Sequence, residues 1–416
     1  MERQVPSVTP REGIHALARN ADAFGRAGQR PMDKRIHFRA HALATLAFSL
    51  GAAWCAFGVP QPASGAPVPL SQDRLCPQRL HMRHPELCSS RGPSALLMSS
   101  ALQGLYPLMP LPAMQVDPAL GEIPFQYHRL PAEGAPTFAS YRDAVHGNWP
   151  SGQIAPGQTY LSYSACEDAD GVAVYNIEPG IYVRGGEECG HLAMPRFQGM
   201  AFSHTPSHPF GWMLGSPATF SAPGPGAAET GNRLDPYDVV QIYESATLGG
   251  WQGFRIGAEE WVEAYFVAVV DPDPTPPEGV PGDSWISVNL QEQTVAVYDH
   301  RQLVYATLAS TGAPGRWTRP GLFQVVERLE HDDMQGASTR DPSDAYFLED
   351  VPWVLYFDGG RALHAAYWHN RYGFPHTHGC VNLAPVDAHW LYNWAEFGTW
   401  VYVWDPSGRT PTDLPG

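Results

Sequence analysis

The clearest hydrophobic pattern in the chain lies in its last third, where apolar and polar residues alternate over positions 284–311. The alternating apolar residues are Ile286, Val288, Leu290, Val295, Val297, Leu303 and Tyr305. A period of two is typical of strands that bury one face, and the Asp299–His300 pair interrupts it as a turn would. This stretch therefore predicts a β-hairpin followed by a further strand.

The same kind of pattern continues towards the C-terminus. Further strands are predicted in 318–330, 351–357, 362–368 and 399–404. One helix is predicted over 385–398, because Pro385 suits a first helical turn and Gly398 lies just beyond the last periodic residue. The sequence thus predicts a mainly β domain with one helix near its end.

A weak internal repeat precedes this domain. Residues 175–183 read YNIEPGIYV and residues 254–262 read FRIGAEEWV, and each follows a strand-like segment. Short alternating segments broken by glycine turns predict two small β-barrels, and the pattern resembles bacterial SH3-like modules. If Tyr182 and Trp261 were exposed, the modules could bind cell-wall glycan. The alternative is that both rings belong to the cores of the barrels.

Changes in composition divide the chain into segments. Residues 271–283, DPDPTPPEGVPGD, form a Pro-rich linker and a predicted domain boundary. The predicted segments are an N-terminal extension with signal peptide (1–66), a disulfide-stapled segment (67–120), SH3-like repeat 1 (121–200), SH3-like repeat 2 (201–270), the linker (271–283), a C-terminal domain (284–405) and a tail (406–416).

The N-terminal region has the order of a secretory signal peptide. A basic stretch at 32–39 is followed by an apolar run at 42–59 and then by small residues up to Ala66. We therefore expect an extracytoplasmic protein of the cell wall or periplasm. The alternative is an uncleaved segment that anchors the chain in the membrane, since 18 apolar residues are just enough to span it.

The net charge of the chain bears on which classes of molecule it is expected to bind. With 26 Lys and Arg against 42 Asp and Glu, the net charge is −16. No basic patch is visible in the sequence, so a nucleic acid is not an expected partner.

The cysteines raise the question of chemistry. In an oxidising compartment we expect cysteines to pair, and the local pairs are Cys76 with Cys88 and Cys166 with Cys189. Four cysteines allow three connectivities, so this pairing is an inference from proximity. Cys55 lies within the predicted signal peptide, so among the cysteines outside it this pairing leaves Cys380 as the odd thiol.

Three interpretations of Cys380 compete. A metal site is suggested by its neighbours His364, His369, His376, His378 and His389, but their spacing does not fit the usual zinc patterns. A buried structural thiol is the second interpretation. The third is a nucleophile, which needs a base such as imidazole. His364 lies on a neighbouring predicted strand, where cross-strand distances suit a Cys–His pair.

The residues around this cysteine resemble the catalytic signature of the YkuD-type L,D-transpeptidases. His364 is followed, after about a dozen residues, by Thr377, His378, Gly379, Cys380, Val381 and Asn382. Two departures are Ala365, where glycine is frequent, and Thr377, where serine is commoner. The resemblance covers residues 284–404 and implies a β-sandwich catalytic domain with one helix after the nucleophile.

The resemblance also implies a mechanism and roles. Cys380 would attack the carbonyl of the third residue of a peptidoglycan stem tetrapeptide and release D-alanine, while His364 moves the proton and donates from its other nitrogen to a carbonyl such as that of Ala365. A second stem amine would then form a 3→3 crosslink, without metal or cofactor. The amides of His378, Gly379 and Cys380 would form an oxyanion hole, with His378 kept as a third catalytic candidate. The candidate substrate contacts are Tyr367, Trp368, Thr377 and Asn382; the first two could equally be core aromatics.

Two other functions remain open at this point. Water as the acceptor would make the same Cys–His pair a carboxypeptidase or amidase. A wall-binding protein, with an inactive last domain and functional SH3-like repeats, is the alternative from another class.

Overall fold

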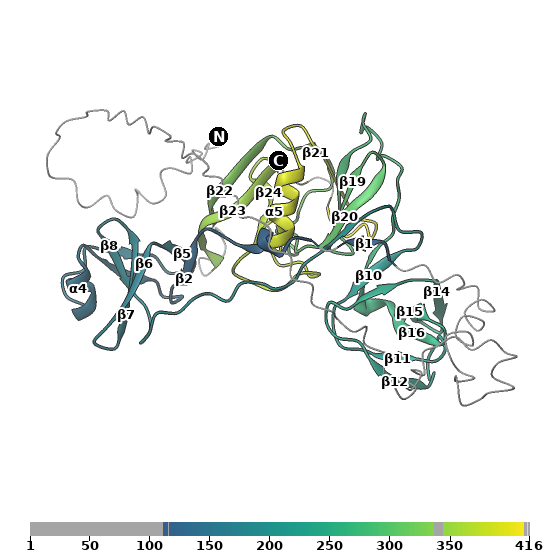
Figure 1. The fold of residues 1–416 in the computed structure, drawn as a ribbon, viewed down its shortest axis with the longest axis horizontal. Helices are drawn as coiled ribbons and strands as arrows, with labels where there is room; N and C mark the ends of the chain where they lie inside the picture. The colour runs from purple at the N-terminus through teal and green to yellow at the C-terminus, as the bar shows by residue number, and fades with distance from the viewer. Residues whose placement is uncertain (1–110, 115, 337–343, 412–413, 415–416) are drawn as a thin grey trace, which may run out of the picture. The chain divides into compact units, whose positions relative to one another are not determined.

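The computed structural model describes residues 111–114, 116–336, 344–411 and 414. The predicted signal peptide, the Cys76–Cys88 pair and positions 67–110 lie outside these residues. Within the described part of the chain, no helix is both long and apolar enough to cross a membrane. Among the described residues, strands greatly outnumber helices, which confirms the predicted mainly β fold class at that level (Figure 1).

The predicted hairpin of the C-terminal domain belongs to a seven-stranded sheet, here called sheet A. Its strands, in spatial order, are β1 (Ala113–Met114), β9 (Met200–Phe202), β20 (Gln302–Leu308), β19 (Thr294–Asp299), β18 (Trp285–Asn289), β26 (Trp400–Trp404) and β21 (Gly321–Gln324). β18 and β26 run parallel, and the other neighbouring pairs are antiparallel.

A second sheet, sheet B, carries the residues around Cys380. In spatial order it contains β2 (Gln126–Arg129), β5 (Gln158–Tyr163), β23 (Tyr346–Asp358), β24 (Arg361–Ala365) and β25 (Val381–Leu383), with β22 (Glu327–Gly336) paired to β23. β24 and β25 are parallel neighbours. Because β24 ends at His364–Ala365 and β25 begins just after Cys380, this pairing places the signature residues on adjacent strands.

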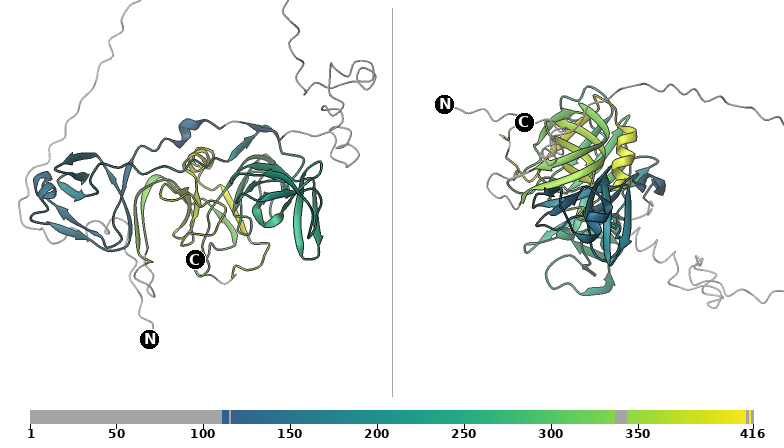
Figure 2. Two further views of the ribbon diagram at one scale, coloured as in Figure 1. Left: turned by 90° about the horizontal axis from the view of Figure 1, so that it is seen from below. Right: turned by 90° about the vertical axis from the view of Figure 1, so that its left-hand side faces the viewer.

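Sheets A and B enclose a common hydrophobic core with the helix α5 (Pro385–Trp394). This core includes Val288 and Val297 from sheet A, Leu363 from sheet B, and Ala388 and Leu391 from α5. Figures 1 and 2 show α5 lying along the strands of this domain. The helix is four residues shorter than the predicted 385–398 segment, since Ala395 already has an extended backbone.

Sheet A is buried on both faces, which its simple alternation does not reveal. Trp285, Ala296, Tyr298 and Leu303 point away from the first core and join a second cluster with Trp212. Trp212 lies on β10 (Phe210–Met213), in a three-stranded sheet with β13 (Val239–Gln241) and β17 (Val267–Val270). The segment before the linker therefore covers the second face of sheet A.

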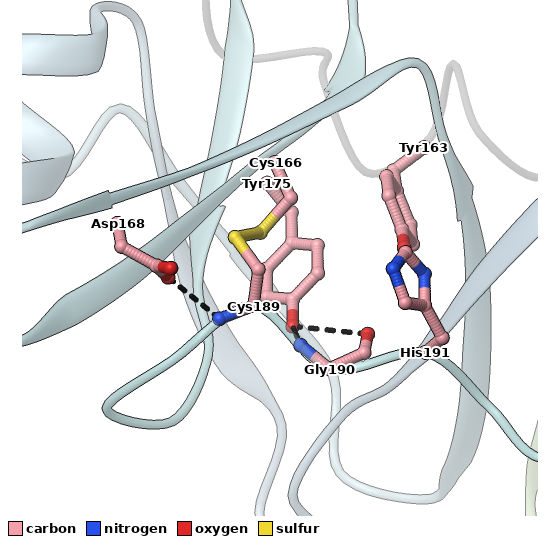
Figure 3. The surroundings of a disulfide bond; sticks show 7 residues. All are labelled: Tyr163, Cys166, Asp168, Tyr175, Cys189, Gly190 and His191. Atoms are coloured by element: carbon pink, nitrogen blue, oxygen red, sulfur yellow. Dashed lines mark hydrogen bonds between the residues drawn. A yellow bond between two sulfur atoms is a disulfide. The ribbon is translucent and has the colours of Figure 1, made fainter.

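The first repeat forms a five-stranded sheet, stapled by a disulfide. Its strands, in spatial order, are β4 (Gly152–Ile154), β3 (Ala135–Phe138), β8 (Ile181–Arg184), β7 (Val172–Glu178) and β6 (Ala165–Ala169). The short helix α4 (Tyr141–His146) packs against this sheet. The Cys166–Cys189 bond is present, as predicted, and Asp168 accepts a hydrogen bond from the Cys189 amide beside it (Figure 3).

The second repeat also contains a five-stranded sheet. Its strands are β12 (Glu229–Arg233), β11 (Ala218–Phe220), β16 (Glu260–Glu263), β15 (Trp251–Gly257) and β14 (Glu244–Leu248). The two matched sequence stretches both form antiparallel hairpins, β7–β8 and β15–β16. Trp261 is buried, which favours the core interpretation for that ring. The described residues also contain two short 3₁₀ turns, η2 (Pro118–Gly121) and η3 (Ala264–Phe266).

The predicted segment boundaries do not separate the sheets. β2 and β5, from the first repeat region, pair within sheet B, and β9, at the boundary between the repeats, pairs with β20 of sheet A. The SH3-like assignment of the two repeats stays a prediction.

Candidate active site

Cys380 and His364 lie on the same face of sheet B. In the parallel register of β24 and β25, His364 is opposite Asn382, and Leu363 is opposite Val381. Parallel neighbours in register point to one face, and Cys380, two positions before Asn382, shares that face. Continuing the register one position places Cys380 beside Ala362, about 7 Å along the strand from His364. Cys380 is a free, partly exposed thiol.

Two threonines hold the loop that presents the thiol. The buried hydroxyl of Thr318 donates to the carbonyl of Gly379 over 2.8 Å and accepts from the amide of Gly312 over 2.9 Å. The hydroxyl of Thr377 donates to the carbonyl of Cys380 over 2.6 Å. Gly379 has φ +124°, where L side chains are strained, so this turn requires glycine directly before the cysteine.

The thiol lies between opposing electrostatic influences. Burial has the largest effect and raises the pKa of Cys380 above its ordinary value, while a hydrogen bond from the amide of Ala362 and the charge of Arg361 only partly offset this rise. The sulfur also lies 3.7 Å from the carbonyl oxygen of Gly360. The start of β24 thus surrounds the sulfur with a guanidinium and a backbone amide, both of which favour the thiolate.

His364 is held as a neutral base. Its side chain is 2% exposed, and Nδ1 lies 3.0 Å from the carbonyl oxygen of Ala365, as the resemblance implies. A carbonyl only accepts, so Nδ1 carries the proton and Nε2 keeps its lone pair. Burial lowers the pKa of His364 to about 4, although the hydrogen bond to Ala365 acts in the opposite direction. Near neutral pH this imidazole is therefore uncharged and able to accept a proton.

His378 lies in different surroundings. Its Nε2 is 3.2 Å from the carboxylate of Asp344, which is also paired with Arg316, and its ring packs against Tyr346. The imidazole is thus engaged with its own acidic partner. This favours a supporting role for the His378 side chain over a place in the proton transfer.

A charged network anchors Arg361 beside the thiol. Asp358, with a side chain 3% exposed, accepts from Arg361 over 2.8 Å and from Nε of Arg319 over 2.9 Å. A buried carboxylate needs such partners. These three residues were not predicted from the sequence, because nothing in their local pattern indicates that the β23–β24 turn and position 319 meet near the cysteine.

The predicted substrate contacts have different outcomes. For Tyr367 the structure favours the core alternative: its side chain is 1% exposed, its ring stacks on Tyr127 with centroids 3.5 Å apart, and its hydroxyl donates to the carbonyl of Glu349. Trp368 is partly exposed and stacks beside His364, with centroids 5.8 Å apart. It therefore stays a candidate for the substrate groove.

Thr377 and Asn382 are buried, and both have partners within the protein. Thr377 accepts from the amide of Gly379 over 3.1 Å, so this amide is engaged within the loop. Of the three predicted oxyanion donors, the amides of His378 and Cys380 stay proposals, whereas that of Gly379 points at Thr377. The side-chain amide of Asn382 lies 3.0 Å from Nε2 of His369.

The histidines near Cys380 bear on the interpretation of this region as a metal site. Among the residues that the structure describes, no group of three or more His, Cys, Asp and Glu side chains is placed to hold a metal ion. Individual histidines near Cys380 instead have other partners, such as the Ala365 carbonyl for His364 and Asp344 for His378.

Comparison with known proteins identifies the domain that carries this site. Residues 283–403 match the model of the L,D-transpeptidase catalytic domain (YkuD). L,D-transpeptidase 1 of Mycobacterium tuberculosis is 30% identical over 118 residues, which are 27% of this chain and 47% of that protein. L,D-transpeptidase 2 of the same species is 30% identical over 120 residues, or 28% of this chain and 29% of that protein. The chain thus spans less than half the length of these curated relatives.

Solved structures of such domains are also similar to parts of the chain. The catalytic domain of an Enterococcus faecium L,D-transpeptidase is 27% identical, with coverage of 30% of this chain and 100% of that chain and a TM-score of 0.27. An L,D-transpeptidase of Mycobacterium smegmatis is 16% identical, with coverage of 71% and 100% and a TM-score of 0.28. The family match and the curated relatives confirm the prediction of an L,D-transpeptidase catalytic domain in the last third of the chain.

Proposed function

We propose that this protein is an exported peptidoglycan L,D-transpeptidase that forms 3→3 crosslinks through a Cys380 acyl-enzyme. The observation that carries the proposal is the placement of a free thiol and a neutral, Nδ1-protonated His364 on one face of parallel strands. This arrangement supplies a nucleophile and a base with its lone pair available. Export rests on the order of basic, apolar and small residues in 32–66.

In the first half of the reaction, Nε2 of His364 takes the thiol proton. The sulfur of Cys380 attacks the carbonyl carbon of the third residue of a stem tetrapeptide. The C–N bond to D-alanine then breaks, and the proton held by His364 goes to the leaving amine. The product is a thioester with Cys380 and free D-alanine. Arg361 and the amide of Ala362 assist by favouring the thiolate that attacks.

The tetrahedral intermediate carries a negative oxygen that needs donors. We assign this role to the backbone amides of Cys380 and His378, since the amide of Gly379 is held by Thr377. The hydrogen bonds of Thr318 and Thr377 fix the loop, so these donors do not have to be organised during the reaction.

In the second half, the side-chain amine of another stem attacks the thioester carbonyl. His364 accepts a proton from this amine and returns one to the sulfur, which leaves as the thiol. The new amide bond joins the third residues of two stems. The acidic chain, with net charge −16, is compatible with a cationic amine acceptor.

The test is product analysis with purified stem tetrapeptides. The full chain should release D-alanine and form tetrapeptide–tripeptide dimers whose link joins the two third residues. Cys380→Ala should do neither, and His364→Gln should be strongly impaired. Release of D-alanine without dimers at saturating acceptor would replace the proposal by a carboxypeptidase. Muropeptide binding with neither product would favour a wall-binding protein.

A further inference from the structure

His369, in the segment after β24, has both ring nitrogens in contact with other groups. The backbone amide of Arg371 donates to Nδ1 of His369 over 3.1 Å. Nε2 of the same ring lies 3.0 Å from the side-chain amide of Asn382, the residue opposite His364 in the strand register. A peptide N–H can only donate, so Nδ1 must be unprotonated. A neutral imidazole has one N–H, which must therefore be on Nε2.

The surroundings keep this ring neutral. Burial lowers the pKa of His369 to about 3, and the neighbouring His376, His364 and Arg371 act in the same direction. The ring of His369 meets that of His376 edge-on, with centroids 5.1 Å apart. With its proton on Nε2, His369 can donate a hydrogen bond to Asn382, and the atom of Asn382 that faces Nε2 must therefore be an acceptor.

This requirement determines which end of the Asn382 amide faces the ring. In the structure the amide nitrogen of Asn382 faces Nε2, which would oppose two donors, and its buried oxygen has no hydrogen-bond partner among the described residues. The two ends exchange by a 180° rotation that leaves the shape of the side chain unchanged, and hydrogen bonding decides between them. The rotated amide accepts from Nε2 of His369 and has its NH₂ group at the position without a partner.

We infer that His369 is a positioning residue that fixes the Asn382 amide so that its NH₂ group is presented on the sheet face of Cys380 and His364. Asn382 is 4% exposed, so this NH₂ group is a buried donor that has no hydrogen-bond partner among the described residues. The backbone of Asn382 is independently paired with Ser310, so the strand does not need the side chain for its ladder. A buried donor left unpaired favours binding of a group that accepts a hydrogen bond.

The chemical class of that group follows, and this step rests on the proposed function. An acyl-donor peptide offers carbonyl oxygens, which accept, whereas the attacking amine of the acceptor offers mainly donors. We therefore assign the Asn382 NH₂ group to a carbonyl oxygen of the acyl donor. His369 then acts on the acylation half of the reaction through Asn382, without touching the substrate.

The first test does not depend on activity. Long-range ¹H–¹⁵N NMR spectra of the full chain labelled with ¹⁵N-histidine report which ring nitrogen is protonated, and His369→Gln assigns the signal. The inference predicts a neutral His369 with its proton on Nε2 throughout pH 5–8. A proton on Nδ1, or titration of the ring near pH 6.5, would overturn it.

The second test separates positioning from a merely structural role. His369→Phe keeps a planar ring but removes both hydrogen bonds, whereas His369→Gln retains a donor and an acceptor. We expect His369→Phe to lower kcat/KM for the acyl donor about 10- to 100-fold, the range of one buried hydrogen bond, and His369→Gln to recover most of this loss. The ratio of dimer to hydrolysis product should be unchanged, because it is set after acylation.

Alkylation of Cys380 by iodoacetamide provides the matched control. Its rate should be the same in the wild type and His369→Phe, since alkylation does not use the Asn382 donor. Equal losses in the Phe and Gln variants, or a parallel loss of alkylation, would refute the positioning role. If the wild type releases no D-alanine, the proposed function fails, and the NMR measurement still decides the inference on His369.

Discussion

Replacement of Glu349 by glutamine should change how the stability of the protein depends on pH. Glu349 lies on β23 and is 8% exposed, and its carboxylate accepts from the amide of Ser162 on β5 over 2.8 Å. Burial raises the pKa of Glu349 from its ordinary value of 4.5 to about 8, and the nearby Asp333 and Asp350 add to this rise, while Ser162 opposes it. The folded protein therefore holds a proton that the unfolded chain releases.

The sign and size of the effect follow from this difference. Below pH 4.5 Glu349 is protonated in both the folded and the unfolded protein, so its ionisation does not lower the free energy of unfolding. Between pH 4.5 and about 8 the unfolded state loses its proton first, and the free energy of unfolding decreases as the pH rises. A pKa raised from 4.5 to about 8 lowers the free energy of unfolding by about 5 kcal/mol in total once the pH exceeds both values.

Equilibrium urea unfolding at pH 4.5, 6, 7 and 8, followed by tryptophan fluorescence, measures this dependence. Glu349→Gln keeps an acceptor for the amide of Ser162 and removes the ionisation. The variant should gain stability relative to the wild type as the pH rises, by up to about 5 kcal/mol at pH 8. Glu133→Gln, at an exposed position, is the matched control and should follow the wild type. Parallel profiles for Glu349→Gln and the wild type would refute the reasoning.

Three further predictions concern the proton acceptor, the loop before the thiol and the disulfide. Because burial lowers the pKa of His364 to about 4, kcat/KM for D-alanine release should decrease in acid only near pH 4; an acid limb near 6.5 would contradict a buried neutral base. Thr318→Val leaves the amide of Gly312 and the carbonyl of Gly379 without this partner. The substitution should lower the free energy of unfolding in urea by about 2–4 kcal/mol and slow the alkylation of Cys380. Replacement of Cys166 and Cys189 by alanine opens a loop with a sequence separation of 23, and should destabilise the first repeat by about 3 kcal/mol, whereas unchanged unfolding would contradict a stabilising role of this disulfide.

The catalytic domain was predictable because its signals are local. Alternation identified the strands now seen as β18, β19 and β20, and Pro385 marked the start of α5. Proximity along the chain was enough to pair Cys166 with Cys189 and to leave Cys380 free. Alternation did not show that sheet A is buried on both faces, since the second cover comes from residues near Trp212, far away in the sequence.

The site was predictable only where one motif contains its residues. Cys380 and His364 come from such a motif, and the strand register then places them on one face. The sequence left two alternatives open for Tyr367 because its burial depends on Tyr127, more than two hundred positions earlier. Likewise, the Asp358 network and the pairing of His369 with Asn382 depend on long-range geometry that local patterns do not contain.

The most direct test of the account is to locate the acyl group on the protein. The full chain should be incubated with a stem tetrapeptide without acceptor, quenched in acid and mapped by peptide mass spectrometry. The account predicts a tripeptide thioester on Cys380 in an amount equal to the D-alanine released in the first turnover, and neither product with Cys380→Ala. An acyl group on another residue, or release of D-alanine by Cys380→Ala, would contradict the assignment of Cys380 as the nucleophile.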